Sequence, residues 1–163
     1  MHSYTFDSDR LLNSALRDVY LKRQYTTSTA KHGPFSRPPT LLEAAASGAK
    51  ATIDWKARTF EIGGTLQAVD GLKKKTSSFS GTRYWRWGEG EEYKVRYGDN
   101  MWIISSSDSA DPIATLTSAT AHVFKANPLP VLKIAQSLRV EEQRQFLILV
   151  LLYSETKRLD RQD

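Results

Sequence analysis

The chain has 163 residues, of which 40% are hydrophobic and 25% are charged. These values predict one globular domain over residues 1–163 with a sizeable core, and they exclude wholesale disorder. The sequence contains no cysteine, which excludes disulfides, thiolate metal sites and a cysteine nucleophile, and fits a reducing, intracellular and cytoplasmic location. The net charge of +5 favours anionic partners such as nucleic acid, phosphoinositide head groups or acidic proteins.

The first half of the chain is predicted to form short strands. Candidate strands are "YTFDS" (4–8), "VYLKRQY" (19–25) and "TLLEAA" (40–45). The segment 31–39 contains three prolines and is expected to be a loop. In "KATIDWKARTFEI" (50–62) the apolar residues change parity near Lys56, as a tight hairpin requires.

The middle of the chain continues the pattern of short strands. "EYKVRY" (92–97) alternates apolar and polar residues, which is typical of a strand with one buried face. Further candidate strands and turns are a hairpin turning at 88–90, a turn at 98–100, strands at 101–106, 112–117, 121–125 and 131–136, and a turn cluster at 107–111. The total is about a dozen strands.

The end of the chain has a different character. Residues 146–153 are all apolar, and the residues around them are helix formers, with Glu142 before the run and Lys157 after it. A buried strand is the competing interpretation, but the flanks favour a helix over about 140–160. The apolar run would span roughly 12 Å as a helix, against about 30 Å of bilayer hydrocarbon. We therefore expect no transmembrane helix, and the first ten residues show no secretory signal.

A helix that is apolar on every face must be enclosed on all sides. Because every other predicted element is a strand, we expect a mainly β fold: a closed antiparallel β-barrel of about twelve short strands around the buried C-terminal helix. The alternative is a helix packed on one face of a sheet, with a dimer partner covering the rest.

This arrangement resembles the tubby-like barrel of tubby proteins, plant LURP-one-related proteins and phospholipid scramblases. The sequence itself is similar to a fungal family of unknown function, found mostly in mushroom-forming species. The segments that carry the likeness are, in order, "LLNSALRDVYLKRQYTTST" (11–29), "ATIDW" (51–55), "FEIGG" (60–64), "GLKKK" (71–75), "YWRW" (84–87) and the apolar helix with its charged end. In tubby-type proteins a cationic patch binds phosphoinositides, but that patch cannot be matched here residue by residue, so the resemblance implies a fold and no site.

The sequence contains no motif of a known catalytic or metal site. His2, His32 and His122 lack metal-ligand spacing, and "GEGEEY" lacks the third glycine of a nucleotide fingerprint. We therefore predict no metal and no cofactor. Pairing of carboxylates for acid–base work is not visible in the sequence.

Two segments could bind an anion. In "LKKKTSS" (72–78) three adjacent ammonium groups lie beside hydroxyls, an arrangement that could hold a phosphorylated head group, although a solvated loop explains it as well. In "YWRW" the aromatic residues alternate with cations, as in platforms for single-stranded nucleic acid, but Trp85 and Trp87 are expected in the core and nucleic acid is not favoured. The candidate binding residues are Lys73, Lys74, Lys75, Arg83 and Arg86.

The leading hypothesis is a non-catalytic protein that binds an anionic lipid head group or a protein partner. The alternative is a small intracellular enzyme with a pocket at one end of the barrel that acts on a small molecule.

Overall fold

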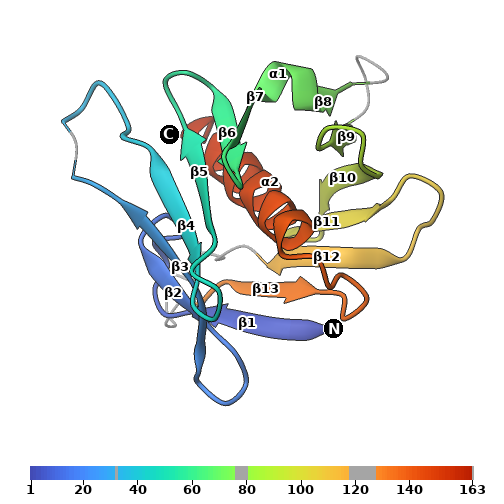
Figure 1. The fold of residues 1–163 in the computed structure, drawn as a ribbon, viewed down its shortest axis with the longest axis horizontal. Coiled ribbons are helices and arrows are strands. Elements are labelled where there is room, and N and C mark those ends of the chain that lie inside the picture. Colours follow the sequence, from blue (N-terminus) through green and yellow to red (C-terminus); the bar gives the residue numbers. More distant parts are fainter. Residues whose placement is uncertain (32, 76–80, 118–127, 163) are drawn as a thin grey trace.

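The computed structural model describes residues 1–31, 33–75, 81–117 and 128–162 (Figure 1). In these residues it contains 13 strands and two helices. The strands are β1 (His2–Phe6), β2 (Ser14–Arg17), β3 (Arg23–Thr29), β4 (Thr40–Ala44), β5 (Lys50–Asp54), β6 (Thr59–Ile62), β7 (Thr65–Ala68), β8 (Lys73–Lys74), β9 (Arg83–Arg86), β10 (Glu92–Gly98), β11 (Met101–Ser106), β12 (Pro112–Thr117) and β13 (Val131–Ile134). The helices are α1 (Val69–Leu72) and α2 (Glu141–Asp160).

All 13 strands belong to one antiparallel sheet in the order β7-β6-β5-β4-β3-β2-β1-β13-β12-β11-β10-β9-β8. Strands that follow one another in the sequence are therefore neighbours, apart from β7 and β8. The pairing of β1 with β13 joins the two halves of this meander, with Tyr4 opposite Leu132. The mainly β fold with a C-terminal helix agrees with the expectation from the sequence.

The sheet is not closed into a barrel. Within the described residues, β7 pairs only with β6 and β8 pairs only with β9. The short helix α1 joins these two end strands, and β8 is only two residues long, so it offers few backbone groups for another ladder. The closed barrel expected from the sequence is therefore replaced by a curved sheet that is open between β7 and β8.

The helix α2 lies inside the curve of the sheet (Figure 1) and contacts β5 and β6 on one side and β11 and β12 on the other. Its whole apolar run, Phe146–Tyr153, is at most 3% exposed. A helix buried around its full circumference was the central prediction from the sequence, and the burial confirms it. The run forms one continuous core with side chains from the inner face of the sheet.

Polar contacts fix the first turn of α2 against the sheet. Tyr25 on β3 donates a hydrogen bond to Glu141 (3.3 Å), and Arg144 donates one to the hydroxyl of Tyr4 on β1 (2.8 Å). Val140, the N-cap residue, provides no side-chain cap. These contacts to the sheet orient the helix, and the acidic residues of its first turn complement its dipole.

Local sequence explains most strand positions. Ile53 and Phe60 are fully buried and face each other across the β5–β6 pair, as the change in parity predicts. The turn predicted at 98–100 is confirmed, because Asp99 and Asn100 both have positive φ, as a tight hairpin turn between β10 and β11 requires.

Residues 19–22 form a turn, so the strand predicted over 19–25 was placed too early. The Asp18 carboxylate accepts hydrogen bonds from the backbone N–H groups of Tyr20 (2.9 Å) and Lys22 (3.0 Å). Leu21 adopts the left-handed region with φ 64°. The aspartate competes with the strand ladder for backbone donors, and β3 begins only at Arg23.

Three short strands and one helix were not predicted: β2, β7, β8 and α1. Gly63 and Gly64 both have positive φ and make the two-residue turn that sends β7 back along β6. The strand predicted over 121–125 lies outside the described residues. No helix within the described residues combines the length and apolar content that a membrane crossing needs.

Candidate functional site

The largest cavity described here, about 730 Å³, lies between the C-terminal half of α2 and strands β8 to β11. We call it the cationic cleft. The turn between β5 and β6 contributes Arg58 to its wall. The cavity lies beside β8, one of the two end strands of the sheet, so the opening of the sheet places it there.

Aromatic rings form the base of the cationic cleft. Trp85 on β9 and Tyr153 on α2 are both buried, and their rings meet edge to face with centroids 5.9 Å apart. Phe60 stacks nearly parallel on Trp85 at 5.8 Å and also meets Tyr153 edge to face at 5.7 Å, so each of the three rings contacts the other two. Contacts of this kind add to the stability gained from burial, so they hold the base of the cleft rigidly.

The charged residues that line the cleft are mostly basic. The cations are Arg58, Lys73, Arg83, Lys157, Arg158 and Arg161, and the single carboxylate is Asp160. That carboxylate is paired with Arg37 at 3.1 Å, a residue outside the lining. Arg58 and Arg158 are likewise paired with carboxylates outside the lining, Asp70 at 2.9 Å and Glu155 at 2.8 Å, and basic residues still outnumber acidic ones around the cleft.

Lys73 occupies the centre of this arrangement. Its ammonium lies 5.8 Å from the ring centre of Trp85 and 5.7 Å from that of Tyr153, within the range of a cation–π interaction. Burial lowers the pKa of Lys73, and the positive charges of Arg58 and Arg83 lower it further. The fold thus holds a half-buried ammonium in a site where its charge is disfavoured.

Two other cations of the cleft are positioned by aromatic rings. The guanidinium of Arg158 lies 4.7 Å from the ring centre of Tyr97, and the ammonium of Lys157 lies 5.8 Å from that of Tyr153. Arg158 also donates two hydrogen bonds of 2.8 Å to the buried carboxylate of Glu155. This charge-assisted pair raises the pKa of Arg158 and fixes its side chain at the wall of the cleft.

The structure brings together only two of the five basic residues predicted from the sequence, Lys73 and Arg83. Side chains alternate between the two faces of a strand. Arg83 therefore shares the inner face with Trp85, while Arg86 is exposed on the outer face and lies 3.7 Å from Glu92. Lys74 and Lys75 are exposed and do not line the cleft.

Four basic residues of the cleft were missed: Arg58, Lys157, Arg158 and Arg161. Lys157 and Arg158 lie in the last turn of α2, where the helix dipole alone explains their charge, and Arg161 is the C-cap residue that follows the helix. Lys157, Arg158 and Arg161 lie within about one helical turn of one another, so their side chains lie close together on the surface. This spacing can be read from the sequence. Arg58 follows from no local pattern, because the turn reaches the cleft through the tertiary fold.

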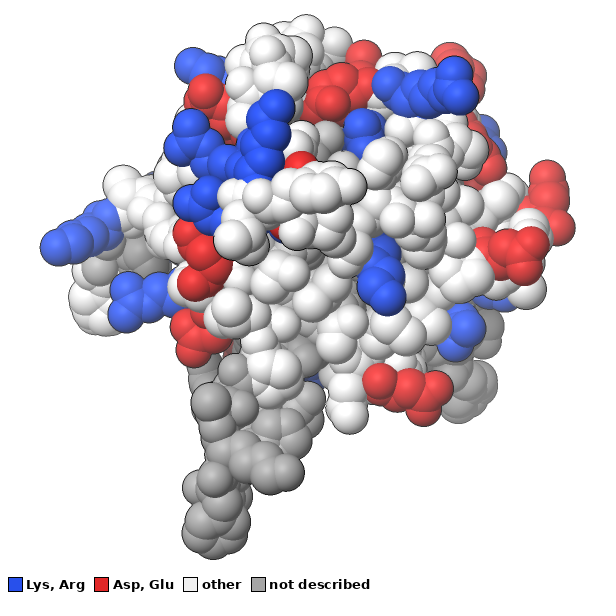
Figure 2. Space-filling view, turned by 90° about the horizontal axis from the view of Figure 1, so that it is seen from below, with Lys and Arg blue, Asp and Glu red and all other residues white. Residues whose placement is uncertain are grey.

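The net positive charge does not by itself mark one face of the molecule. On the face viewed from below, acidic side chains lie among the basic ones, and much of the surface is uncharged (Figure 2). The candidate site therefore rests on the residues that line the cleft, and not on the overall charge of the chain.

In the described part of the chain, no three His, Asp or Glu side chains are arranged to hold a metal ion. His32 and His122 lie outside the described residues, so this finding does not extend to them.

These observations define a mainly β protein in which a curved antiparallel sheet surrounds a C-terminal helix, with a cationic, aromatic-based cleft beside the end of that helix. Residues 9–160 match the family of unknown function DUF6593, and the chain belongs to that family. No curated protein and no solved structure matches the chain.

Proposed function

We propose that the protein is a non-catalytic binding protein whose cationic cleft holds a phosphate-bearing anion, as found in the head group of an anionic lipid. The observation that carries this proposal is the position of Lys73, a half-buried ammonium over two aromatic rings with further cations around it. Among the described residues Lys73 has no carboxylate in an ion pair with it.

An anion in the cleft would remove an electrostatic cost of the free protein. The neighbouring cations Arg58 and Arg83 disfavour the charge of Lys73, and a bound phosphate would reverse this effect by attracting all three. Phosphate oxygens accept hydrogen bonds from ammonium and guanidinium groups, and these charge-assisted bonds are among the strongest in proteins.

The size and composition of the cleft are suitable for a head group. Its volume of about 730 Å³ falls in the range of small-molecule sites, about 300–1,000 Å³. An intracellular location, where anionic lipids of the cytoplasmic leaflet are accessible, is part of the proposal.

The alternative is a small enzyme that uses the same cleft. Lys73, whose pKa is lowered by burial, is a type of group that can act as a general base, but acid–base catalysis also needs a second group that exchanges a proton. Asp160, the carboxylate that lines the cleft, and Glu155, the buried carboxylate that holds Arg158, are each paired with an arginine. We therefore favour binding over catalysis.

The test compares two double variants of equal charge. Lys73→Met with Lys157→Met removes two ammonium groups of the cleft, and Lys50→Met with Lys133→Met removes two exposed ones from β5 and β13. Binding is measured to phosphatidylcholine liposomes with and without a phosphoinositide, and to a soluble inositol polyphosphate.

We expect the cleft variant to lose roughly 10- to 30-fold in affinity, at about 1 kcal/mol for each basic residue near an anionic surface. The control variant should bind almost as well as the parent. Binding to the soluble ligand alone would identify a free phosphate compound as the source. Equal loss in both variants, or no binding to either ligand, would contradict the proposal.

A further inference from the structure

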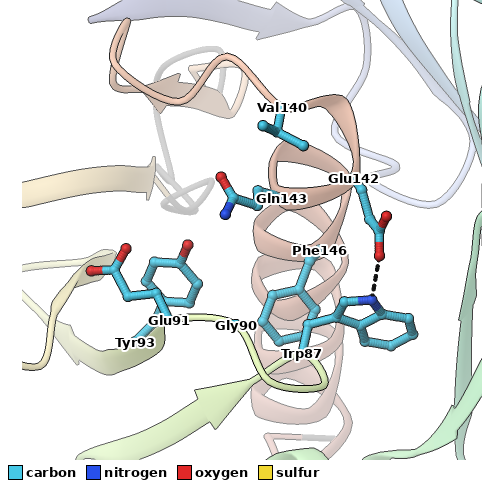
Figure 3. A pocket seen from close by; sticks show the side chains of 8 residues that line it. All are labelled: Trp87, Gly90, Glu91, Tyr93, Val140, Glu142, Gln143 and Phe146. Atoms are coloured by element: carbon cyan, nitrogen blue, oxygen red, sulfur yellow. Dashed lines mark hydrogen bonds between the residues drawn. The ribbon is translucent and has the colours of Figure 1, made fainter.

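A second and smaller pocket lies near the start of α2, far along the helix from the cationic cleft. Its volume is about 270 Å³, and it is formed by the β9–β10 hairpin and the first turns of α2. Figure 3 shows Trp87 and Phe146 on one side of this pocket and Tyr93 with Glu91 across from them. We call it the acidic aromatic pocket.

Three aromatic rings surround the acidic aromatic pocket. The ring of Phe146 lies 5.6 Å from that of Trp87 at an angle of 42°, and 6.3 Å from that of Tyr93 at an angle of 45°. The rings are tilted rather than stacked, so they present both faces and edges around one small volume. Aromatic faces that converge in this way attract organic cations through their quadrupoles.

The charge of this pocket is opposite to that of the cationic cleft. Its charged lining residues are the carboxylates Glu91 and Glu142, and no lysine or arginine lines it. One oxygen of Glu142 accepts a 2.7 Å hydrogen bond from the indole N–H of Trp87 (Figure 3). This bond fixes the indole ring and holds a negative charge beside it, in a chain whose net charge is +5.

The hydroxyl of Tyr93 is a second, independent observation that indicates a ligand in this pocket. Tyr93 is only 2% exposed, and its hydroxyl has no hydrogen-bond partner among the described residues. Burial, together with the charge of Glu91, raises the pKa of Tyr93, so the hydroxyl stays protonated and neutral. A buried polar group without a partner is rare in folded proteins, and this one belongs to a residue that lines the pocket, so its oxygen is available to accept a hydrogen bond from a ligand bound there.

We propose that the acidic aromatic pocket binds an organic ammonium group that carries at least one N–H, such as a methylated amine. The three rings would contact its methyl groups, the carboxylates of Glu91 and Glu142 would balance its charge, and its N–H would donate to the hydroxyl of Tyr93. Inorganic cations are a poorer match, because most of the exposed lining is apolar and cannot replace their hydration shell.

The experiment uses three probes of similar size and different chemistry. Trimethylammonium carries a charge and an N–H, tetramethylammonium carries a charge without an N–H, and tert-butanol carries neither charge nor N–H. Each is titrated into the full chain, and the shift of the Trp87 indole N–H is followed by nuclear magnetic resonance. We expect trimethylammonium to bind roughly tenfold more tightly than tert-butanol, which corresponds to a partly desolvated cation–π contact.

Variants of single residues test the role of each group. Tyr93→Phe removes only the unpaired hydroxyl, so it should keep the melting temperature and lose the preference for trimethylammonium over tetramethylammonium. Glu142→Gln keeps an oxygen that can accept from Trp87 but removes the charge, and it should weaken both cations without affecting tert-butanol. Glu89→Gln, an exposed residue of the same hairpin outside the pocket, is the matched control and should change nothing.

The proposal predicts that affinity falls in the order trimethylammonium, tetramethylammonium, tert-butanol. Equal affinity for all three would show a purely apolar pocket and would overturn the proposal. Absence of binding by trimethylammonium would overturn it as well. Equal weakening by Glu89→Gln and Glu142→Gln would show that the effect comes from the overall charge of the hairpin, which also contradicts a specific site.

Discussion

The indole N–H of Trp102 donates a 2.8 Å hydrogen bond to the carboxylate of Glu155 and so links β11 to α2. The same carboxylate accepts two hydrogen bonds from Arg158. Glu155 is only 2% exposed, so these partners satisfy carboxylate oxygens that water does not reach. One buried acidic residue therefore anchors the helix to the sheet and positions a basic residue of the cationic cleft.

We predict that Glu155→Gln destabilises the protein by about 1–3 kcal/mol, because it replaces charge-assisted hydrogen bonds with weaker ones and leaves one donor without a good partner. Urea denaturation measures this loss. Trp102→Phe removes only one donor and should cost less. If Glu155→Gln unfolds at the same urea concentration as the parent, the carboxylate does not hold the helix in place.

Lys73→Met should separate stability from binding. Methionine keeps an apolar chain of similar length over Trp85 and Tyr153, and it removes a charge that burial and two arginines disfavour. The melting temperature should stay equal or rise, while affinity for an inositol polyphosphate falls. This result is typical of a residue that lowers the stability of the folded protein but is needed for binding. A lower melting temperature with unchanged affinity would assign Lys73 a purely structural role.

Anion binding should depend on pH through Lys73. Its pKa is lowered, first by burial and then by Arg58 and Arg83, and only the protonated ammonium attracts an anion. The contribution of Lys73 to binding is therefore complete below this lowered pKa and is lost as pH rises through it. Affinity should begin to fall at a lower pH than expected for an ordinary lysine, whose pKa is about 10.4.

Titration calorimetry with a ligand that carries one phosphate monoester, such as an inositol monophosphate, between about pH 7.5 and pH 10 measures this effect, because an isolated phosphate monoester, whose second pKa is about 6, has completed its ionisation in this range. Lys73→Arg keeps a positive charge throughout and should show a flatter profile. If the parent and Lys73→Arg give the same profile, another group controls the pH dependence.

The enclosed helix is tested at its centre. Leu149 has no exposed surface, so Leu149→Lys would bury an ammonium at a cost of several kcal/mol even after relaxation, and the protein should express unfolded. Leu149→Met preserves volume and should cost less than about 1.5 kcal/mol. Thermal melts compare the two variants, and a Leu149→Lys protein that melts near the parent temperature is incompatible with an enclosed α2.

The sequence predicted the core better than the edges of the sheet. The apolar run Phe146–Tyr153 required enclosure whatever the details of the surrounding strands, and the parity of Ile53 and Phe60 fixed the β5–β6 hairpin. Closure of the barrel depended instead on whether two end strands meet. The short helix α1 and the two-residue β8 prevent this, and neither has a strong pattern in the sequence.

The candidate site was predicted only in part, for a geometric reason. A run of three lysines suggested one cluster, but the pleat of β8 sends Lys73 and Lys74 to opposite faces. The basic residues of the cationic cleft instead come from four separate segments, including Arg58 from a turn and Arg161 from beyond α2. A local sequence pattern shows which residues lie on the same face of one helix or strand. It does not show which helices and strands come together in the folded chain.

A phosphate-bearing anion bound in the cationic cleft should change the surroundings of the tryptophan side chains that line it. The chain contains four tryptophans, of which Trp85 and Trp102 line the cationic cleft and Trp87 lines the acidic aromatic pocket. Each indole N–H can be assigned with a Trp→Phe variant and followed by nuclear magnetic resonance while an inositol polyphosphate is added. We predict that the signals of Trp85 and Trp102 shift in a saturable manner while that of Trp87 does not. Shifts confined to Trp87, or no shift of any indole signal at saturating ligand, would contradict the claim.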